Sequence, residues 1–316
     1  MSRHDVKSQR WPLLEAGFAP GTIKKYRPAV HRFLNWCHTT GSDAQTDDDL
    51  DELLADYFQQ HHTENGGKGK SLAAVTLAGI RMYLPRLKTP SLPTASAVCA
   101  RWNKSKPPVS YPPLTWDLTV VIALQLIRGG HFRFGVATLV GFHCLLRVGE
   151  LTSLRREHFA DHKDARLGAE YRKALVSIEK AKTGRYQSVT VDDPVVRQLL
   201  SDIVAKTKPG ARLFPGGADG YRKAFKSACA SLGLSEKYVP HSLRHGGATR
   251  MHIAGVPIAD ILIRGRWKST ESAKTYIKMG PALLMAMSAP EAVAKAAAVL
   301  AKDVALSVTL AQKHKV

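Results

Sequence analysis

The chain has 316 residues, of which 44% are hydrophobic and 23% are charged, so it can build sizeable cores and is not a disordered polymer. Its 46 Lys and Arg against 26 Asp and Glu give a formal net charge of +20, which indicates an anionic partner. Nucleic acid is the first candidate and an anionic membrane surface the second. No apolar stretch approaches the roughly 18 residues of a membrane helix, so we expect no membrane-spanning segment.

The spacing of apolar residues predicts that residues 1–102 form a helical domain. Ile23 to Cys37 has an apolar face and a basic face at helical spacing. The acidic run 43–52 predicts the start of a second helix, because acidic side chains favour a helix N-terminus. The glycine-containing segment 61–70 predicts a loop, and 72–87 predicts a third helix.

Residues 103–115 predict an extended linker, because they contain four prolines and two lysines without a helical pattern. The chain is basic on both sides of it. Residues 1–113 carry 15 Lys and Arg against 10 Asp and Glu, and residues 114–316 carry 31 against 16. A chain of this kind is suited to close around a nucleic-acid duplex like a clamp.

Residues 116–316 predict a second domain that is mostly helical. The segments with helical periodicity are 116–129, 133–146, 194–206, 218–232, 242–254, 257–264, 270–279 and a final apolar helix at 290–311. Two β-rich runs, 174–179 and 187–191, flank a basic turn and predict a hairpin. The predicted fold class is therefore mainly α: a helical N-terminal domain, then an α+β domain with a small sheet.

Three short motifs in this second domain carry side chains suited to phosphate chemistry. His241 and Arg244 lie one turn apart at the start of a predicted helix. Trp267 and Tyr276 lie nine residues apart, and Arg147 follows an apolar helix. Taken singly, each motif is more typical of a solvated face, of packing, or of a charge at a helix end.

In this order, however, the motifs resemble the signature of the tyrosine recombinases, the phage integrase family. Gly265-Arg266-Trp267 stands where many members have Gly-His, and residues 241–277 are most similar to members with tryptophan there. The run GTIKKYRPAVHRFLNWC is similar to the start of the family's core-binding domain. The resemblance covers roughly residues 15–280, and it implies the family's fold: a helical core-binding domain (1–102), a linker (103–115) and a catalytic domain (116–316).

The resemblance implies that the protein moves a DNA phosphodiester onto a tyrosine, without metal, ATP or another cofactor. Tyr276 would be the nucleophile that forms a 3′-phosphotyrosyl bond. Arg147 and Arg244 would hold the scissile phosphate, since a guanidinium binds two oxygens at once and stays charged. His241 would contact the phosphate and assist proton transfer, and Trp267 would donate to the phosphate and pack the pocket.

Three further roles follow from the same resemblance. Lys182, at the predicted hairpin tip, would protonate the departing 5′ oxygen, with Lys180 as the alternative. Glu150 matches the acidic position that orients the first arginine, and His245 would support the site from behind.

The partner implied is double-stranded DNA with inverted half-sites, bound by a dimer at each site and by a homotetramer in the full assembly. In that assembly the helix at 290–311 is expected to dock on a neighbouring protomer. Candidate DNA contacts are Lys24, Lys25, Arg81, Lys104, Lys106, Lys180 and Arg185. The cysteines have no CxxC spacing, so we expect no zinc site and buried thiols in a reducing compartment, either cytoplasm with nucleoid or nucleus.

Two alternatives remain open from the sequence. One is a DNA-binding protein that keeps the fold without the reaction, which the six competent catalytic positions argue against. The other is a type IB topoisomerase or a telomere resolvase. The short chain and the C-terminal motifs favour a site-specific recombinase or integrase of a mobile element.

Overall fold

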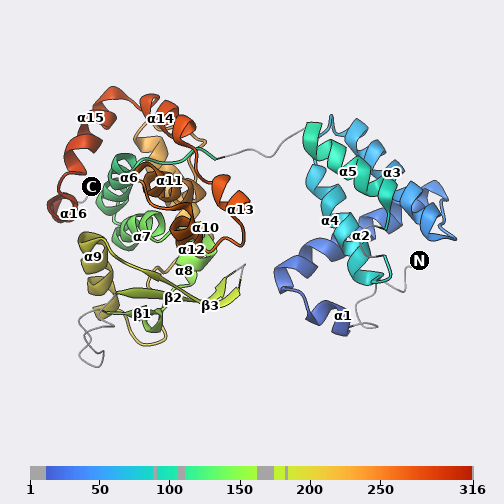
Figure 1. Ribbon diagram of the computed structural model, residues 1–316, viewed down its shortest axis with the longest axis horizontal. Helices are drawn as coiled ribbons and strands as arrows, with labels where there is room; N and C mark the ends of the chain where they lie inside the picture. Colours follow the sequence, from blue (N-terminus) through green and yellow to red (C-terminus); the bar gives the residue numbers. More distant parts are fainter. Residues whose placement is uncertain (1–11, 88–90, 106–110, 162–173, 182–183, 315–316) are drawn as a thin grey trace. The chain divides into compact units, whose positions relative to one another are not determined.

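The computed structural model describes residues 12–87, 91–105, 111–161, 174–181 and 184–314 (Figure 1). The chain forms two compact units, residues 1–109 and residues 110–316, and each has a hydrophobic core of its own. None of the described helices is long and apolar enough to cross a membrane. Three of the four cysteines are buried and Cys37 is half-buried, and all four are free thiols.

The described part of the first unit is helical. Its helices are α1 (Pro12–Ala16), α2 (Pro20–Thr40), α3 (Asp47–Glu64), α4 (Lys70–Tyr83) and α5 (Pro93–Ser105). Helix α2 packs against α4, and α3 packs against α5. Phe33, Phe58, Ile80 and Trp102 are among the side chains that fill the core between them.

Two helices of this unit differ from the sequence prediction. Helix α3 continues to Glu64, into the segment 61–70 predicted as a loop. Helix α5 was not predicted, and it extends into the predicted linker. The buried carboxylate of Asp51 on α3 explains where α5 starts. It accepts hydrogen bonds from the backbone N–H groups of Thr94 and Ala95, in the first turn of α5, at 2.8 and 2.9 Å. This cap comes from a distant part of the chain.

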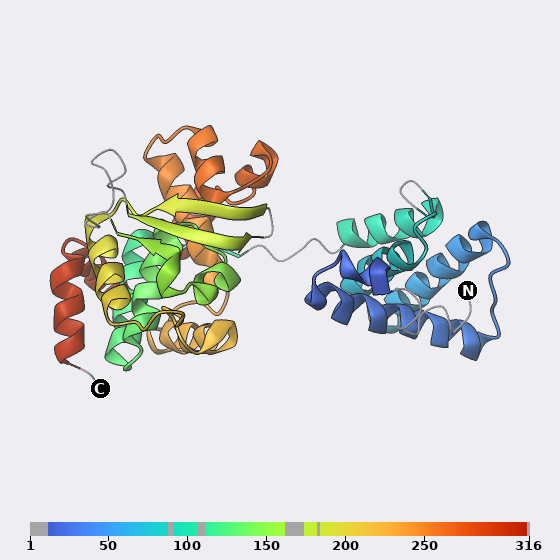
Figure 2. The same ribbon diagram turned by 90° about the horizontal axis from the view of Figure 1, so that it is seen from below.

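The second unit surrounds a central helix pair with further helices and a small sheet (Figures 1 and 2). The central pair is α6 (Trp116–Arg128) and α7 (Phe132–His143). The other helices are α8 (Val148–Ser153), α9 (Pro194–Ala205), α10 (Gly217–Ser231), α11 (Pro240–Ile253), α12 (Ile258–Gly265), α13 (Thr270–Lys274), α14 (Met279–Met287), α15 (Glu291–Leu300), α16 (Val304–Lys313) and a short 3₁₀ turn (Arg156–His158).

The sheet is antiparallel, in the order β1 (Phe159–Ala160), β2 (Leu175–Ala181) and β3 (Gly184–Thr190). Strands β2 and β3 form the predicted hairpin, with Val176 opposite Val189. The two-residue strand β1 was too short to be predicted. A mainly helical chain with one small sheet confirms the predicted fold class.

The C-terminal segment differs most from its prediction. The sequence predicts one helix over residues 290–311, whereas the structure has two, because Asp303 caps the start of α16 by accepting from the backbone N–H of Leu306. Both helices pack against α6 of the same chain, and Ala297 and Val308 join its core. Most of the apolar stripe is thus covered within the same chain, and docking of this segment on a neighbouring protomer in the DNA-bound assembly stays a prediction.

Candidate active site

The first turns of α11 carry three of the candidate residues. His241 and Arg244 lie one helical turn apart, as predicted, and His245 follows directly. The side chain of Arg244 is fully buried, and its guanidinium donates to the carbonyl oxygens of Leu145 and Gly265. Arg244 therefore ties α11 both to the turn that precedes Arg147 and to the end of α12.

Tyr276 lies at the centre of an aromatic cluster. The sequence predicts a helix over 270–279, but α13 ends at Lys274 and Tyr276 occupies the turn that follows. Its ring stacks on His245 with centroids 4.4 Å apart, and the rings of Trp267 and His241 lie 4.7 and 5.5 Å away. The indole Nε1 of Trp267 is buried without a hydrogen-bond partner among the described residues, so in this structure Trp267 contributes packing.

Thr249 attaches the turn of Tyr276 to α11. Its buried hydroxyl donates to the carbonyl of Tyr276 at 3.2 Å and accepts the backbone N–H of Lys278 at 3.1 Å. The helix that carries His241 and Arg244 therefore also fixes the backbone on both sides of Ile277. No sequence pattern indicates this contact, because threonine within a helix most often packs or bonds to its own helix.

Glu150 pairs with Arg147, which occupies the N-cap position of α8. The backbone N–H and the Nη1 of Arg147 donate to the two carboxylate oxygens of Glu150 at 2.9 and 2.6 Å. The Arg147 side chain is 21% exposed and that of Glu150 only 4%, so the acid is buried and the cation reaches the surface. Arg266, which was not among the predicted residues, donates to Glu150 at 2.8 Å.

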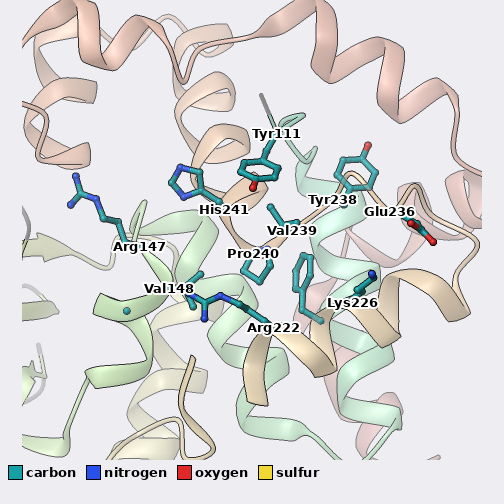
Figure 3. Close-up of a pocket in the computed structure, with 12 residues that line it drawn as sticks. Tyr111, Arg147, Val148, Arg222, Lys226, Glu236, Tyr238, Val239, Pro240 and His241 are labelled. Carbon is teal, nitrogen blue, oxygen red and sulfur yellow. The ribbon is translucent and has the colours of Figure 1, made fainter. Parts of the chain in front are cut away.

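A cavity of about 540 Å³ opens beside Arg147 and His241. Figure 3 shows these two side chains at one edge of it, Lys226 toward the opposite edge, and Tyr111 beside His241. Arg222 and Lys226, both on α10, add positive charge to its lining. Among the described residues, no group of three or more His, Cys, Asp or Glu could hold a metal ion. The site is therefore arranged to receive an anion through guanidinium and imidazole groups.

Burial keeps the two histidines of the cluster neutral. Desolvation, and then the charges of Arg244 and Arg147, lower the pKa of His241 to about 4. Desolvation, and then His241, lower the pKa of His245 to about 3. A neutral His241 can accept a proton near neutral pH, whereas His245 presents an uncharged ring to Tyr276.

The lysine predicted at the hairpin tip, Lys182, lies outside the described residues, as does Lys106. The backbones of Lys180 and Arg185 pair across β2 and β3, so both residues flank the tip.

The remaining candidate DNA contacts lie on the first unit. Lys24, Lys25 and Lys104 are exposed and free to meet a partner surface. Arg81, by contrast, is half-buried and donates at 2.9 Å to the hydroxyl of Ser96 on α5. Its guanidinium thus serves the packing of α4 on α5.

The chain is similar in sequence to a known family and to known recombinases. Residues 131–281 match the model of the phage integrase family. The chain is 27% identical over 260 residues to tyrosine recombinase XerC from Methylobacterium sp. (strain 4-46), which covers 75% of this chain and 76% of that protein. It is 28% identical over 123 residues to the putative integrase/recombinase y4qK of Sinorhizobium fredii (strain NBRC 101917 / NGR234), a match that spans 37% of this chain and 40% of that relative's length.

Two solved structures share the fold. A lambda integrase dimer bound to a COC′ core site superimposes with a TM-score of 0.61 at 17% identity, over 89% of this chain and 97% of that one. The Tn1549 transposon integrase in complex with transposon right end DNA gives 0.57 at 12% identity, over 91% and 98%. At these identities the likeness establishes the architecture alone.

Proposed function

Because residues 131–281 belong to the phage integrase family of tyrosine recombinases, we propose that this protein is a site-specific DNA recombinase of a mobile element that works through a 3′-phosphotyrosyl intermediate. The observation that carries the proposal is the position of Tyr276. Its ring lies between His245 and Trp267, beside His241, and close to the buried charge of Arg244.

The reaction follows from these side chains. The hydroxyl oxygen of Tyr276 attacks the scissile phosphorus, the new O–P bond forms, and the bond from phosphorus to the 5′ oxygen breaks. Arg147 and Arg244 stabilise the charge that gathers on the phosphoryl oxygens of the transition state. His241, neutral before the reaction, accepts the tyrosine proton, and Lys182 donates one to the departing oxygen. Attack by the 5′ hydroxyl of a second strand reverses these steps and rejoins the DNA.

The partner we propose is duplex DNA with two inverted half-sites, a dimer of the protein on each site and four protomers in the recombining complex. The basic cavity lining and the excess of Lys and Arg favour a polyanion. The residues in these roles are nitrogen bases and a phenol, so we propose that cleavage needs neither metal nor ATP.

A suicide substrate tests the reaction. It is a DNA site nicked next to the scissile phosphate, so that the cleaved fragment diffuses away and the covalent intermediate accumulates. The wild-type protein should form a DNA adduct that survives denaturant, in excess EDTA and without ATP. Tyr276→Phe should bind the same DNA and form none. An undiminished adduct with Tyr276→Phe would remove Tyr276 from its role.

The same preparation separates the alternatives. Binding of DNA without any adduct on any site would indicate a DNA-binding protein that has the fold alone. Relaxation of a supercoiled plasmid that lacks a target site would indicate a topoisomerase.

A further inference from the structure

We infer that Arg266 is a positioning residue: it holds Glu150 from within the protein, so that Glu150 orients Arg147 without neutralising it. This inference rests on the proposed function, in which Arg147 binds the scissile phosphate. It concerns a residue that makes no contact with the substrate itself.

The three side chains form a continuous chain of hydrogen bonds. One oxygen of Glu150 accepts from Arg147 Nη1 at 2.6 Å, and the other accepts from Arg266 Nη2 at 2.8 Å and from the Arg147 backbone at 2.9 Å. The side chains of Arg266 and Glu150 are 3% and 4% exposed, whereas that of Arg147 is 21% exposed. The order from the interior to the cavity is therefore Arg266, Glu150, Arg147.

The charges explain why the second arginine matters. A buried carboxylate needs a cation, and a pair of Arg147 with Glu150 alone would have no net charge with which to attract a phosphate. With Arg266 present the triad carries a net charge of +1. The buried cation compensates the buried acid, and Arg147 keeps its charge and its remaining N–H donors for an anion in the cavity.

Arg266 also fixes the backbone that leads into Arg147. Its guanidinium donates to the carbonyls of Leu145 at 3.0 Å and Cys144 at 3.4 Å. Leu145 has a φ of 50° and Arg266 itself a φ of 55°, a conformation that glycine adopts far more readily than any other residue. An arginine at such a position indicates that its side chain compensates for an unfavourable backbone.

The pKa of Glu150 agrees with this arrangement. Burial raises this pKa, but the charge of Arg266, followed by the backbone and side chain of Arg147, lowers it by more than burial raises it. The pKa of Glu150 therefore lies below its usual value. The other charged groups near Glu150 are Arg244, and Arg155, His158, Glu179 and Arg212 around a small cavity next to the sheet. They are present in every variant below, so their charges are common to all of the proteins compared.

The first test is a thermal-unfolding cycle of four proteins: wild type, Glu150→Gln, Arg266→Met and the double variant. Methionine keeps most of the side-chain length and meets the same backbone penalty at φ 55°, so it removes the charge and its hydrogen bonds. Arg266→Met should lower the melting temperature by about 5–15 °C, the effect of leaving a buried charge without its partner. Adding Glu150→Gln should recover part of that loss. Additive effects would overturn the coupling, and this result does not depend on any DNA reaction.

The second test measures the rate of adduct formation on the suicide substrate from pH 5.5 to 8. Arg266→Met should react about 10–100-fold more slowly than wild type, the usual effect of removing a partner that orients a ligand-binding group. The deficit should grow as the pH falls, because Glu150 without Arg266 gains a proton at higher pH and releases Arg147. Arg266→Lys, which restores the charge, should recover most of the rate, and the double variant should lose the added pH dependence.

Arg264→Met is the matched control. Arg264 lies two residues earlier and also holds backbone carbonyls, those of His143 and Thr190, but it pairs with Asp192 rather than Glu150. It should lower stability without changing the pH profile. If Arg266→Met follows the wild-type profile, or if Arg264→Met acquires the same new pH dependence, Arg266 is only structural. If the wild type itself forms no adduct, the proposed function fails instead.

Discussion

The sequence offers two lysines at the predicted hairpin tip, Lys180 and Lys182, and we propose that Lys182 protonates the 5′ oxygen that leaves the phosphate. We expect Lys182→Ala to slow cleavage by about 10²–10⁴-fold with little change in DNA affinity, because a general acid acts mainly in the transition state. A substrate with sulfur in place of the bridging 5′ oxygen has a better leaving group and should restore the rate.

Lys180→Ala is the control for this prediction. Lys180 lies on the same hairpin and should keep most of its cleavage rate with the ordinary substrate. If sulfur rescues Lys180→Ala instead, then Lys180 is the acid and the assignment of Lys182 is wrong.

The hydroxyl of Thr249 joins the turn of Tyr276, the proposed nucleophile, to the helix that carries His241 and Arg244. Thr249→Val keeps the shape of the side chain and removes both hydrogen bonds. We expect a fall of about tenfold or more in the rate of adduct formation with DNA affinity unchanged, since small displacements of a reacting group are costly. Thr249→Ser restores the hydroxyl and should restore the rate. A slow Thr249→Ser variant with an intact fold would indicate a packing role instead.

Sequence motifs identified the residues proposed to act on the phosphate, together with Glu150 and His245 as their supports, but not Thr249 or Arg266. His241, Arg244 and Tyr276 stand in the order and at the spacings of the family's motifs, so the resemblance predicts them. Thr249 and Arg266 matter because of what they meet across the fold, 27 and 116 residues away. No local pattern encodes such a contact.

At the scale of single elements, the start of α5 depends on one buried carboxylate. Asp51→Ala should lower the free energy of unfolding of the first unit by about 1–2 kcal/mol, because two backbone N–H groups lose their acceptor. Urea unfolding of the variant gives this value. Asp56→Ala, at an exposed position of the same helix, is the control and should change it by less than about 0.5 kcal/mol. Equal losses from the two variants would contradict the capping role.

Local sequence patterns located some of these elements and missed others. Helical periodicity located most of the long helices of both units to within a few residues, and the β-rich runs located the hairpin. The errors lie where local signals compete with distant ones: Asp51 caps α5 from another helix, and Asp303 divides a segment whose apolar spacing is nearly continuous. The two-residue strand β1 exists only because β2 pairs with it.

For the second unit as a whole, we expect marked sensitivity to acid. The half-buried His143 and His241 and the buried His245 have pKa values lowered, mainly by desolvation, to about 4, 4 and 3. On unfolding they return to about 6.5, so the unfolded chain binds more protons between these values. The contribution of these neutral histidines to the free energy of unfolding is therefore complete above pH 6.5 and is lost as the pH falls toward 4.

Denaturant unfolding at pH 7.5 and 5.5 measures this loss, which should be on the order of 1 kcal/mol for each of the three histidines. In His143→Gln, the loss of unfolding free energy between pH 7.5 and 5.5 should be smaller than in the wild type by the share of one histidine. His252→Gln, at an exposed position, should leave it unchanged. Stability that is level across this range would show that the three side chains are not buried as neutral groups.

The whole chain consists of two basic units joined by a proline-rich linker. If both units bind one duplex, the first to bind raises the effective concentration of the second, and the intact chain gains affinity without any new contact. A chain cut between Val109 and Ser110, where the two units divide, should yield halves that each bind DNA at least about 100-fold more weakly than the whole. The affinity of the whole should also fall more steeply with salt than that of either half, because more phosphates are neutralised. Titration of labelled DNA at several salt concentrations compares the three proteins. If one half equals the whole in both affinity and salt dependence, that half makes all the DNA contacts and the linker has no part in binding.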